Sequence, residues 1–227
     1  MQDLGPRYEL HSHTIFSDGK LLPLALVIEA AFRKVSVIAL TDHVDPSNID
    51  WTMKNIVSFV KQIDNKLPIK VIPGAEVSYL PPKMIEEYCK KAKRLGAKLI
   101  IVHGESPVES AVPKGTNQAA LKLKGLVNIL AHPGWITEEL AQQAKDNDIY
   151  LELSARKGHS QGNKHVAKVA KKVGAKLLLN TDAHSDKDLI TQKQALQIAK
   201  RAGLNDEEAI KVVRDNPREL IKRISRQ

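Results

Sequence analysis

Histidines and carboxylates occur in this sequence as short motifs, and the first motif pairs two histidines. In HSHTIFSDG, His11 and His13 lie two residues apart, so both imidazoles project from the same side of an extended chain. The later motifs are TDH at 41–43, GAE at 74–76, VHG at 102–104, AHPG at 131–134 and TDAH at 181–184. Imidazole and carboxylate groups together suit zinc, iron or manganese as ligands. The residue types therefore predict a metal site.

The spacing of the motifs indicates that they share one site. Between His13 and His132 a histidine or glutamate recurs about every 30 residues, each time near the end of a short apolar run. A single histidine at a strand end is more often a hydrogen-bonded structural residue than a ligand, but six of the eight histidines occupy this position. Of the other two, His159 either contacts substrate or lies on the surface, and His165 is expected to be exposed on a helix.

The apolar runs have the length and the Ile, Val and Leu content of buried parallel strands. They cover Tyr8–His11, Val37–Thr41, Lys70–Pro73, Lys98–Val102, Leu126–Ala131, Ile149–Leu153 and Lys176–Asn180. Segments with helical spacing lie between and after them, over Leu22–Lys34, Thr52–Asn65, Lys83–Leu95, Val112–Lys124, Thr137–Asp146, Lys164–Val173, Lys187–Ala202, Asn205–Asp215 and Pro217–Arg226. Gly96, Gly174 and Gly203 stand where three of these helices are expected to end.

Strands that alternate with helices predict parallel βαβ units, which form either a closed barrel or an open doubly wound sheet. In a barrel, the carboxyl ends of the strands converge on one mouth, where the active sites of βα barrels lie. An open sheet would spread the same side chains along an edge too long for one site. We therefore expect an α/β fold with a closed or nearly closed barrel and a metal site at the carboxyl ends of its strands.

Composition limits the class of protein less sharply. Of 227 residues, 42% are hydrophobic and 27% charged, as in globular proteins with a buried core. The net charge of +9 indicates either phosphorylated or nucleic-acid partners or a solvated surface of dispersed lysines. Aromatic residues make up 4% and offer few platforms for stacking bases. We expect a cytoplasmic protein that does not act at a membrane, because no apolar stretch could span a bilayer and MQDLGPRYEL has no hydrophobic signal core.

The set of motifs, in this order, resembles that of the PHP family, the polymerase and histidinol phosphatase superfamily. The motifs are HSHTIFSDG, TDH, GAE, VHG, AHPG and TDAH. The resemblance runs from about residue 8 to about residue 190. It implies a distorted, TIM-like barrel of seven βα units, which agrees with the strand count. We expect residues 1–227 to form a single PHP domain, with the barrel over about 7–203 and C-terminal helices over about 205–226.

The resemblance also implies a trinuclear site, with zinc, manganese or iron as the two or three divalent ions. It implies a first ion held by His11, His13, Glu76 and Asp182, a second held by Glu76, His103 and His132, and a third held by Asp18, His43 and His184. Asp42 is expected to orient a ligand or its loop and not to bind directly. Some relatives place a histidine in the first loop where this chain has Ser17-Asp18-Gly19, which leaves the affinity and identity of the third ion open.

Clustered divalent ions supply two things that phosphate ester hydrolysis needs, a water molecule with a lowered pKa and neutralised phosphoryl charge. We expect direct attack by water without a phosphoenzyme, with Glu76 and Asp182 as catalytic ligands. The loop SARKGHSQGN offers Arg156, Lys157 and His159 for substrate binding, unless it is only a solvated basic loop. Arg156 suits a bidentate phosphate clamp. The general acid for the leaving group is either His159 or a metal-bound water molecule.

Two further side chains are left open by the sequence. Glu152, within the sixth strand, points either to the barrel centre or to the helices, and Arg7 is a lesser candidate for binding phosphate. The stretch 105–124 is the one connection with room for an irregular loop that covers the substrate, and even this stretch is of modest length, so we expect an open pocket.

Three functions compete. The first is a small-molecule phosphatase of the histidinol-phosphatase type that hydrolyses a monoester. The alternative is a nucleotide phosphatase, phosphodiesterase or nuclease that acts on nucleotides or nucleic acid. The third, a regulatory domain that binds metal without chemistry, is disfavoured by the intact ligand set.

Overall fold

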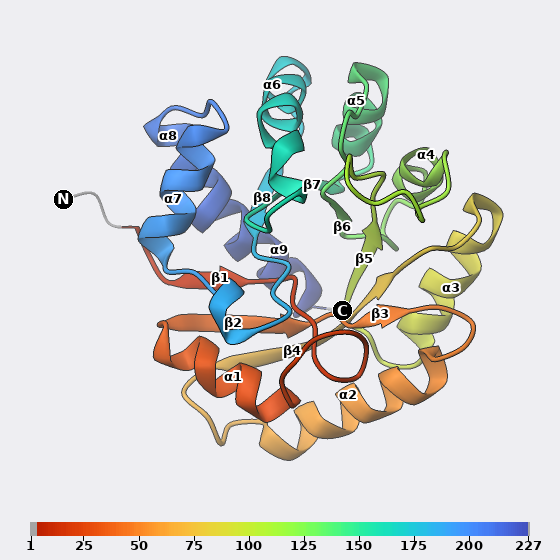
Figure 1. Ribbon diagram of the computed structural model, residues 1–227, viewed down its shortest axis with the longest axis vertical. Helices are drawn as coiled ribbons and strands as arrows, with labels where there is room; N and C mark the ends of the chain where they lie inside the picture. Colours follow the sequence, from red (N-terminus) through yellow and green to blue (C-terminus); the bar gives the residue numbers. More distant parts are fainter. Residues whose placement is uncertain (1–3, 227) are drawn as a thin grey trace.

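Seven parallel strands pair in chain order to form the wall of a nearly closed barrel (Figure 1). The computed structural model describes residues 4–226. The strands are β1 (Arg7–Glu9), β2 (Val35–Leu40), β4 (Lys70–Val77), β5 (Leu99–His103), β6 (Ile129–Ala131), β7 (Tyr150–Ser154) and β8 (Leu177–Asn180). A short strand, β3 (His43–Val44), pairs only with β4. The predicted barrel of seven βα units is confirmed.

The barrel closes between its first and last strands just beyond their carboxyl ends. Ser12 forms a parallel bridge with Ala183, and the backbone N–H of His13 donates to the carbonyl of Ala183 at 2.8 Å. On the other side, the N–H of Thr41 donates to the carbonyl of Ser12 at 2.9 Å. The segment that carries the first two histidines is thus hydrogen-bonded to both neighbours, and its direction is set by the barrel.

The strands are buried on both faces, which explains why they are almost continuously apolar. One face points into the barrel, where Ala39, Leu99, Ile101, Ile129 and Leu178 belong to one apolar cluster. The residues that alternate with them pack against the surrounding helices in two other clusters.

The helices lie around the outside of the barrel (Figure 1). They are α1 (Pro23–Phe32), α2 (Ile49–Ile63), α3 (Pro82–Arg94), α4 (Thr116–Leu121), α5 (Glu138–Asp146), α6 (Asn163–Val173) and α7 (Gln192–Arg201). The predicted glycine caps after α3, α6 and α7 all have positive φ angles, between 76° and 106°. α7 begins later than expected, at Gln192, because Thr191 forms a capping box with Gln194.

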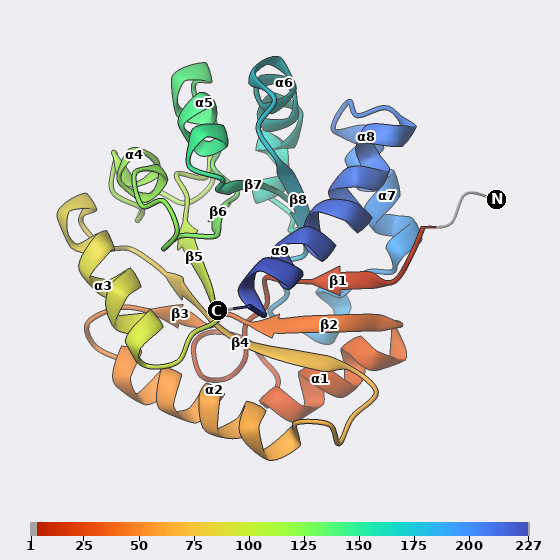
Figure 2. The same ribbon diagram turned by 180° about the vertical axis from the view of Figure 1, so that it is seen from behind.

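The chain then returns to the opposite end of the barrel. α8 (Asp206–Ile210) and a π-helical turn (Lys211–Asp215) lead into α9 (Asn216–Ile224), which lies across the strands in Figure 2. Leu220 and Ile224 of α9 join the apolar cluster inside the barrel. α9 therefore covers the amino ends of the strands and leaves the carboxyl ends for the site. Among residues 4–226, no helix has the length and apolar character needed to cross a membrane.

Candidate metal centre

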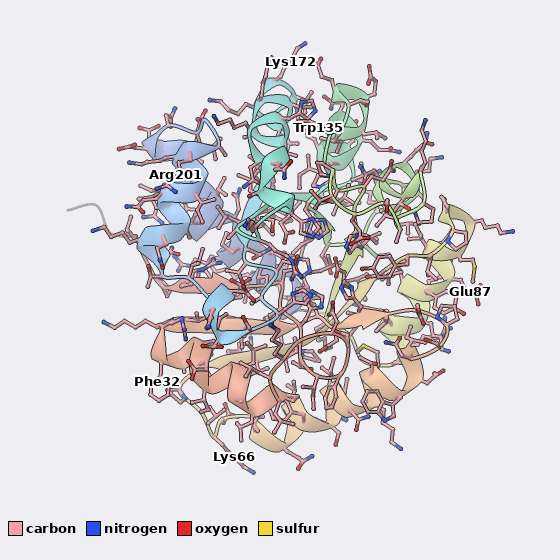
Figure 3. The ribbon with its side chains drawn as sticks, in the orientation of Figure 1. Phe32, Lys66, Glu87, Trp135, Lys172 and Arg201 are labelled. Carbon is pink, nitrogen blue, oxygen red and sulfur yellow. The ribbon has the colours of Figure 1, made fainter. Side chains whose placement is uncertain are left out.

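The predicted ligands meet at the carboxyl ends of the strands, where nitrogen and oxygen atoms of side chains gather over the barrel centre (Figure 3). Imidazole rings from different strands are in contact, with ring centroids 4.2 Å apart for His13 and His184 and 4.5 Å apart for His103 and His132. His11 lies 5.1 Å from His13 by the same measure. The convergence expected from the motif spacing is therefore present in the structure.

The ligands fall into overlapping groups whose donor atoms lie within 4.8 Å of one another. The groups are His13, Asp18, His43 and His184; His11, His13 and Asp182; Glu76, His103 and His132; His11, His132 and Glu152; and His132, His159 and Asp182. The first three correspond to the ligand sets implied by the family resemblance, except that His13 joins the third set and Glu76 is missing from the first. Glu76 also lies near the first set, with Oε2 3.3 Å from Nε2 of His11 and 3.5 Å from Nε2 of His13.

Buried polar atoms without hydrogen-bond partners are concentrated in this cluster. They are Nε2 of His11, both ring nitrogens of His13 and His132, both carboxylate oxygens of Glu76 and Oδ1 of Asp182. Buried polar atoms normally have partners, and each unsatisfied one costs about 1–3 kcal/mol. Here the unsatisfied atoms belong to neighbouring imidazole and carboxylate groups, the donor types that transition metals bind. The residues therefore fit a metal centre.

Hydrogen bonds around the cluster turn the Nε2 atoms of three histidines toward its centre. Nδ1 of His11 lies 2.9 Å from Oε1 of Glu152, and Nδ1 of His103 lies 3.1 Å from the carbonyl of Gly104. A carboxylate and a carbonyl only accept, so Nδ1 carries a proton in both rings, and Nε2 is the nitrogen that would bind a metal ion. Nδ1 of His43 is 2.8 Å from Oε2 of Glu76, which only accepts, and 2.7 Å from the hydroxyl of Ser78, whose own proton goes to the carbonyl of Glu76. His43 is therefore held in the same tautomer.

Asp42 supports the first loop, as predicted. Its carboxylate accepts from the backbone N–H of Thr14 at 2.8 Å and from the hydroxyl of Ser17 at 2.8 Å. These bonds shape the loop that carries Asp18. Gly19 closes the loop, where a Cβ atom would lie 2.3 Å from the carbonyl oxygen of His13.

The carboxylates of the cluster differ in their acidity. Burial raises the pKa of Asp182 to about 7, against the charge of His11 and with the help of the neighbouring Glu76 carboxylate. Burial also opposes ionisation of Glu76, but the charges of His11 and His43 hold its pKa well below the usual range. At Asp18, burial is outweighed by a hydrogen bond from His184 and the charge of His43, which lower the pKa to about 2. Bound cations would keep Asp182 ionised as well.

The loop after β7 contributes two side chains to the cluster. Arg156 donates from Nη1 to the carbonyl of Asp182 at 3.1 Å and contacts the ring of His184. His159 is buried and not on the surface; its Nδ1 is 2.5 Å from the hydroxyl of Ser106, and its Nε2 is 3.7 Å from Oδ2 of Asp182. Lys157 is exposed, and within residues 4–226 no hydrogen bond or ion pair joins it to the cluster.

Three side chains lie elsewhere than expected or were left open. Glu152 points into the barrel, where it meets His11 and accepts from the backbone N–H of His132 at 3.2 Å. Arg7 cannot bind phosphate at the mouth, because it is buried and paired with Glu9 at 2.7 Å. The expectation that His165 is exposed is wrong: it is half-buried, and its Nε2 donates to a backbone carbonyl at 2.7 Å.

The sequence interpretation did not identify Ser78, Tyr79 or Ser106 as residues of the site. Ser78 and Tyr79 come two and three residues after Glu76, just beyond the end of β4, so their position near a ligand was an available signal. Ser106 lies in an irregular loop, and only its contact with His159 reveals it.

Comparison with known proteins gives consistent results. The family model of the PHP domain matches residues 9–148. An uncharacterized protein of Methanocaldococcus jannaschii is 41% identical over 96% of this chain and 100% of its own length. A probable phosphatase of Thermoanaerobacter sp. is 25% identical over 88% of this chain and 87% of its own length.

Two solved structures share the fold. Histidinol phosphate phosphatase from Lactococcus lactis, complexed with zinc, L-histidinol and phosphate, has a TM-score of 0.62 at 18% identity and covers 88% of this chain and 95% of its own. A chain of archaeal ribonuclease P with mature tRNA has a TM-score of 0.69 at 17% identity and covers 95% of this chain and 89% of its own.

Proposed function

This chain belongs to the PHP domain family and is a metal-dependent phosphoesterase, and from this premise we propose that it hydrolyses a small-molecule phosphate monoester. The observation that carries the proposal is the set of buried imidazole and carboxylate atoms at the barrel mouth that lie close together but have no hydrogen-bond partners. A dianionic monoester supplies the negative charge that such a site, once loaded with cations, would attract.

The proposed ligand sets follow the groups in the structure. His11, His13, Glu76 and Asp182 would hold a first ion, Glu76, His103 and His132 a second, and Asp18, His43 and His184 a third. Zinc, manganese and iron all suit these donors, and we propose two or three divalent ions in the active enzyme. Bound ions would supply an acidified water molecule and positive charge for the phosphoryl oxygens.

Arg156 is proposed to bind the phosphoryl group. Its guanidinium is half-buried beside Asp182 and His184, so the fork is already oriented at the edge of the cluster. Two parallel N–H donors on one planar group match two phosphoryl oxygens. Lys157, exposed next to Arg156, would add positive charge at the rim.

His159 is proposed to protonate the leaving oxygen, with a water molecule as the alternative donor. Ser106 holds Nδ1 of His159, which leaves Nε2 facing Asp182. Burial and the nearby charges of His103 and Arg156 lower the pKa of His159 to about 4. A bound phosphate dianion would oppose this shift and favour the protonated ring.

A second candidate is a nucleotide or nucleic-acid substrate. The net charge of +9 favours a polyanionic partner.

We also propose that the whole chain forms one domain, because α9 packs its apolar side chains into the barrel itself.

The test is to purify the protein without chelators, quantify its metals by mass spectrometry and assay it with manganese. The substrates are histidinol phosphate, a sugar phosphate, AMP, a nucleoside 3′,5′-bisphosphate and a short DNA. Bound metal with turnover of a monoester that is lost in Asp182→Ala and kept in Asp64→Ala, an exposed aspartate after α2, would support the proposal. Turnover confined to AMP, the nucleoside bisphosphate or DNA would favour the second candidate, and absence of both metal and turnover would refute the first.

A further inference from the structure

Tyr79 has a backbone conformation that is unusual for a bulky side chain. It follows β4 directly after Ser78, and its φ angle is 61°, in the left-handed region. A large aromatic residue is rarely found there, and such strain is concentrated at functional sites. The side chain is also 41% exposed, so burial of an apolar ring does not explain the choice of tyrosine.

The ring of Tyr79 borders the metal centre. Its centroid lies 5.6 Å from that of His43 and 5.3 Å from that of His103. These two histidines belong to different ligand groups, one shared with Asp18 and the other with Glu76. The ring therefore stands at the edge of the cluster between two ligand groups, with part of its surface open.

A second apolar side chain is exposed on the neighbouring loop. Val108, in the segment after β5, is 48% exposed and packs over Gly158, where an added Cβ atom would lie 3.1 Å from its Cγ2. Gly158 directly precedes His159, whose ring is 6.1 Å from that of His103. Tyr79 and Val108 thus offer open apolar surface beside residues that would act on the phosphate and the leaving oxygen.

We propose that Tyr79 positions the substrate by forming one wall of a subsite for a flat heterocyclic ring on the leaving alcohol. The inference rests on the proposed function, because the polar cluster must hold the phosphoryl group for the alcohol to lie against this wall. An imidazole and a nucleobase both present a π face that stacks on tyrosine, whereas an aliphatic alcohol does not. Val108 would contact the same ring.

The test compares three monoesters of primary or secondary alcohols, namely histidinol phosphate, AMP and glycerol 2-phosphate. Tyr79→Asn removes the ring with an amino acid that tolerates the left-handed conformation, and Tyr79→Phe keeps the ring without the hydroxyl. Phe32→Leu, on α1 at the periphery of Figure 3, removes an exposed aromatic ring far from the mouth and serves as the control. Metal content of each variant is measured alongside KM and kcat.

Tyr79→Asn is expected to raise KM about tenfold for the ring-bearing esters that the enzyme accepts, with little change for glycerol 2-phosphate. Tyr79→Phe and Phe32→Leu should behave as the wild type. A rise in KM for AMP alone would identify the ring as a nucleobase. A rise in KM for histidinol phosphate alone would identify it as an imidazole. An equal rise in KM for all three esters in Tyr79→Asn, or no rise for any of them, would overturn the inference.

If the wild-type protein hydrolyses none of these three esters, equilibrium binding still tests the subsite, whereas the proposed function is tested separately by the wider substrate panel. In that case AMP and glycerol 2-phosphate are titrated into the metal-loaded wild type and Tyr79→Asn. Selective weakening of AMP binding, about tenfold, would support the stacking wall, and equal binding by both proteins would refute it.

Discussion

Replacing Glu152 by glutamine is expected to weaken metal binding without unfolding the protein. The buried carboxylate accepts from Nδ1 of His11 at 2.9 Å, from Nδ2 of Asn180 at 2.9 Å and from the backbone N–H of His132 at 3.2 Å. Glutamine has one accepting oxygen, so its amide N–H must face one of these donors. Whichever donor the amide faces, one hydrogen bond is lost, and the bond from Nδ1 of His11 to a charged carboxylate becomes at best a bond to a neutral amide oxygen.

The size of the effect follows from the bond that is lost. A hydrogen bond to a charged group contributes about 1.5–3 kcal/mol, and each 1.4 kcal/mol is a factor of ten in affinity. Metal affinity should therefore fall about 10- to 100-fold, which is the range found when residues that orient metal ligands are changed.

The measurement is a competition titration of metal against a chromophoric chelator, with circular dichroism of the metal-free protein as a check on folding. Glu219→Gln is the matched control, since Glu219 is exposed on α9 and bonds Lys176 at 2.5 Å. The control should bind metal as the wild type does. Unchanged affinity in Glu152→Gln, or equal weakening in both variants, would refute the assigned role of Glu152.

Three further outcomes are expected. Ser106→Ala should slow hydrolysis of an alkyl phosphate about tenfold but barely affect 4-nitrophenyl phosphate, which needs no proton on its leaving group; equal effects on both would argue against His159 as the acid. Removal of metal with a chelator should lower the unfolding temperature by about 8–16 °C in calorimetry, because metal at about 1,000 times its dissociation constant stabilises the folded state by about 4 kcal/mol. An unchanged unfolding temperature would mean that the folded state binds no metal. The pKa of Asp182 is raised to about 7, so the protonated carboxyl is favoured in the metal-free fold, and its contribution to the free energy of unfolding is full below about pH 4 and is lost as pH rises through 7. Metal must displace this proton, so metal affinity should fall as pH drops through 7. An affinity that does not change between pH 6 and 8 would contradict this.

The recurrence of ligands at strand ends was sufficient to predict the barrel and its metal-binding mouth. Periodicity depends on local sequence, and the carboxyl ends of parallel strands must lie at one end of a barrel. The sequence was therefore enough to place His11, His43 and His132 at the same end of the barrel. The helix ends at glycines such as Gly174 could also be predicted, because the positive φ angle after the last helical turn is a local requirement.

Contacts between distant segments had to come from the tertiary structure. Whether Glu152 faces the barrel centre depends on how β7 is aligned with β6 and β8, and the inward direction puts it against His11, 141 residues away. The path of an irregular loop likewise buries His159 on Ser106.

Sequence alone determined which residue types could bind metal and at which end of the strands they lie, because strand period and βα alternation are local properties. Only the tertiary structure decided which nitrogen of His11 faces Glu152, that Arg7 is paired inside the barrel and that Tyr79 borders the site. The physical reason is that a hydrogen-bond partner or ring contact requires distances of a few ångströms between segments that lie far apart along the chain, and packing of the whole barrel sets those distances.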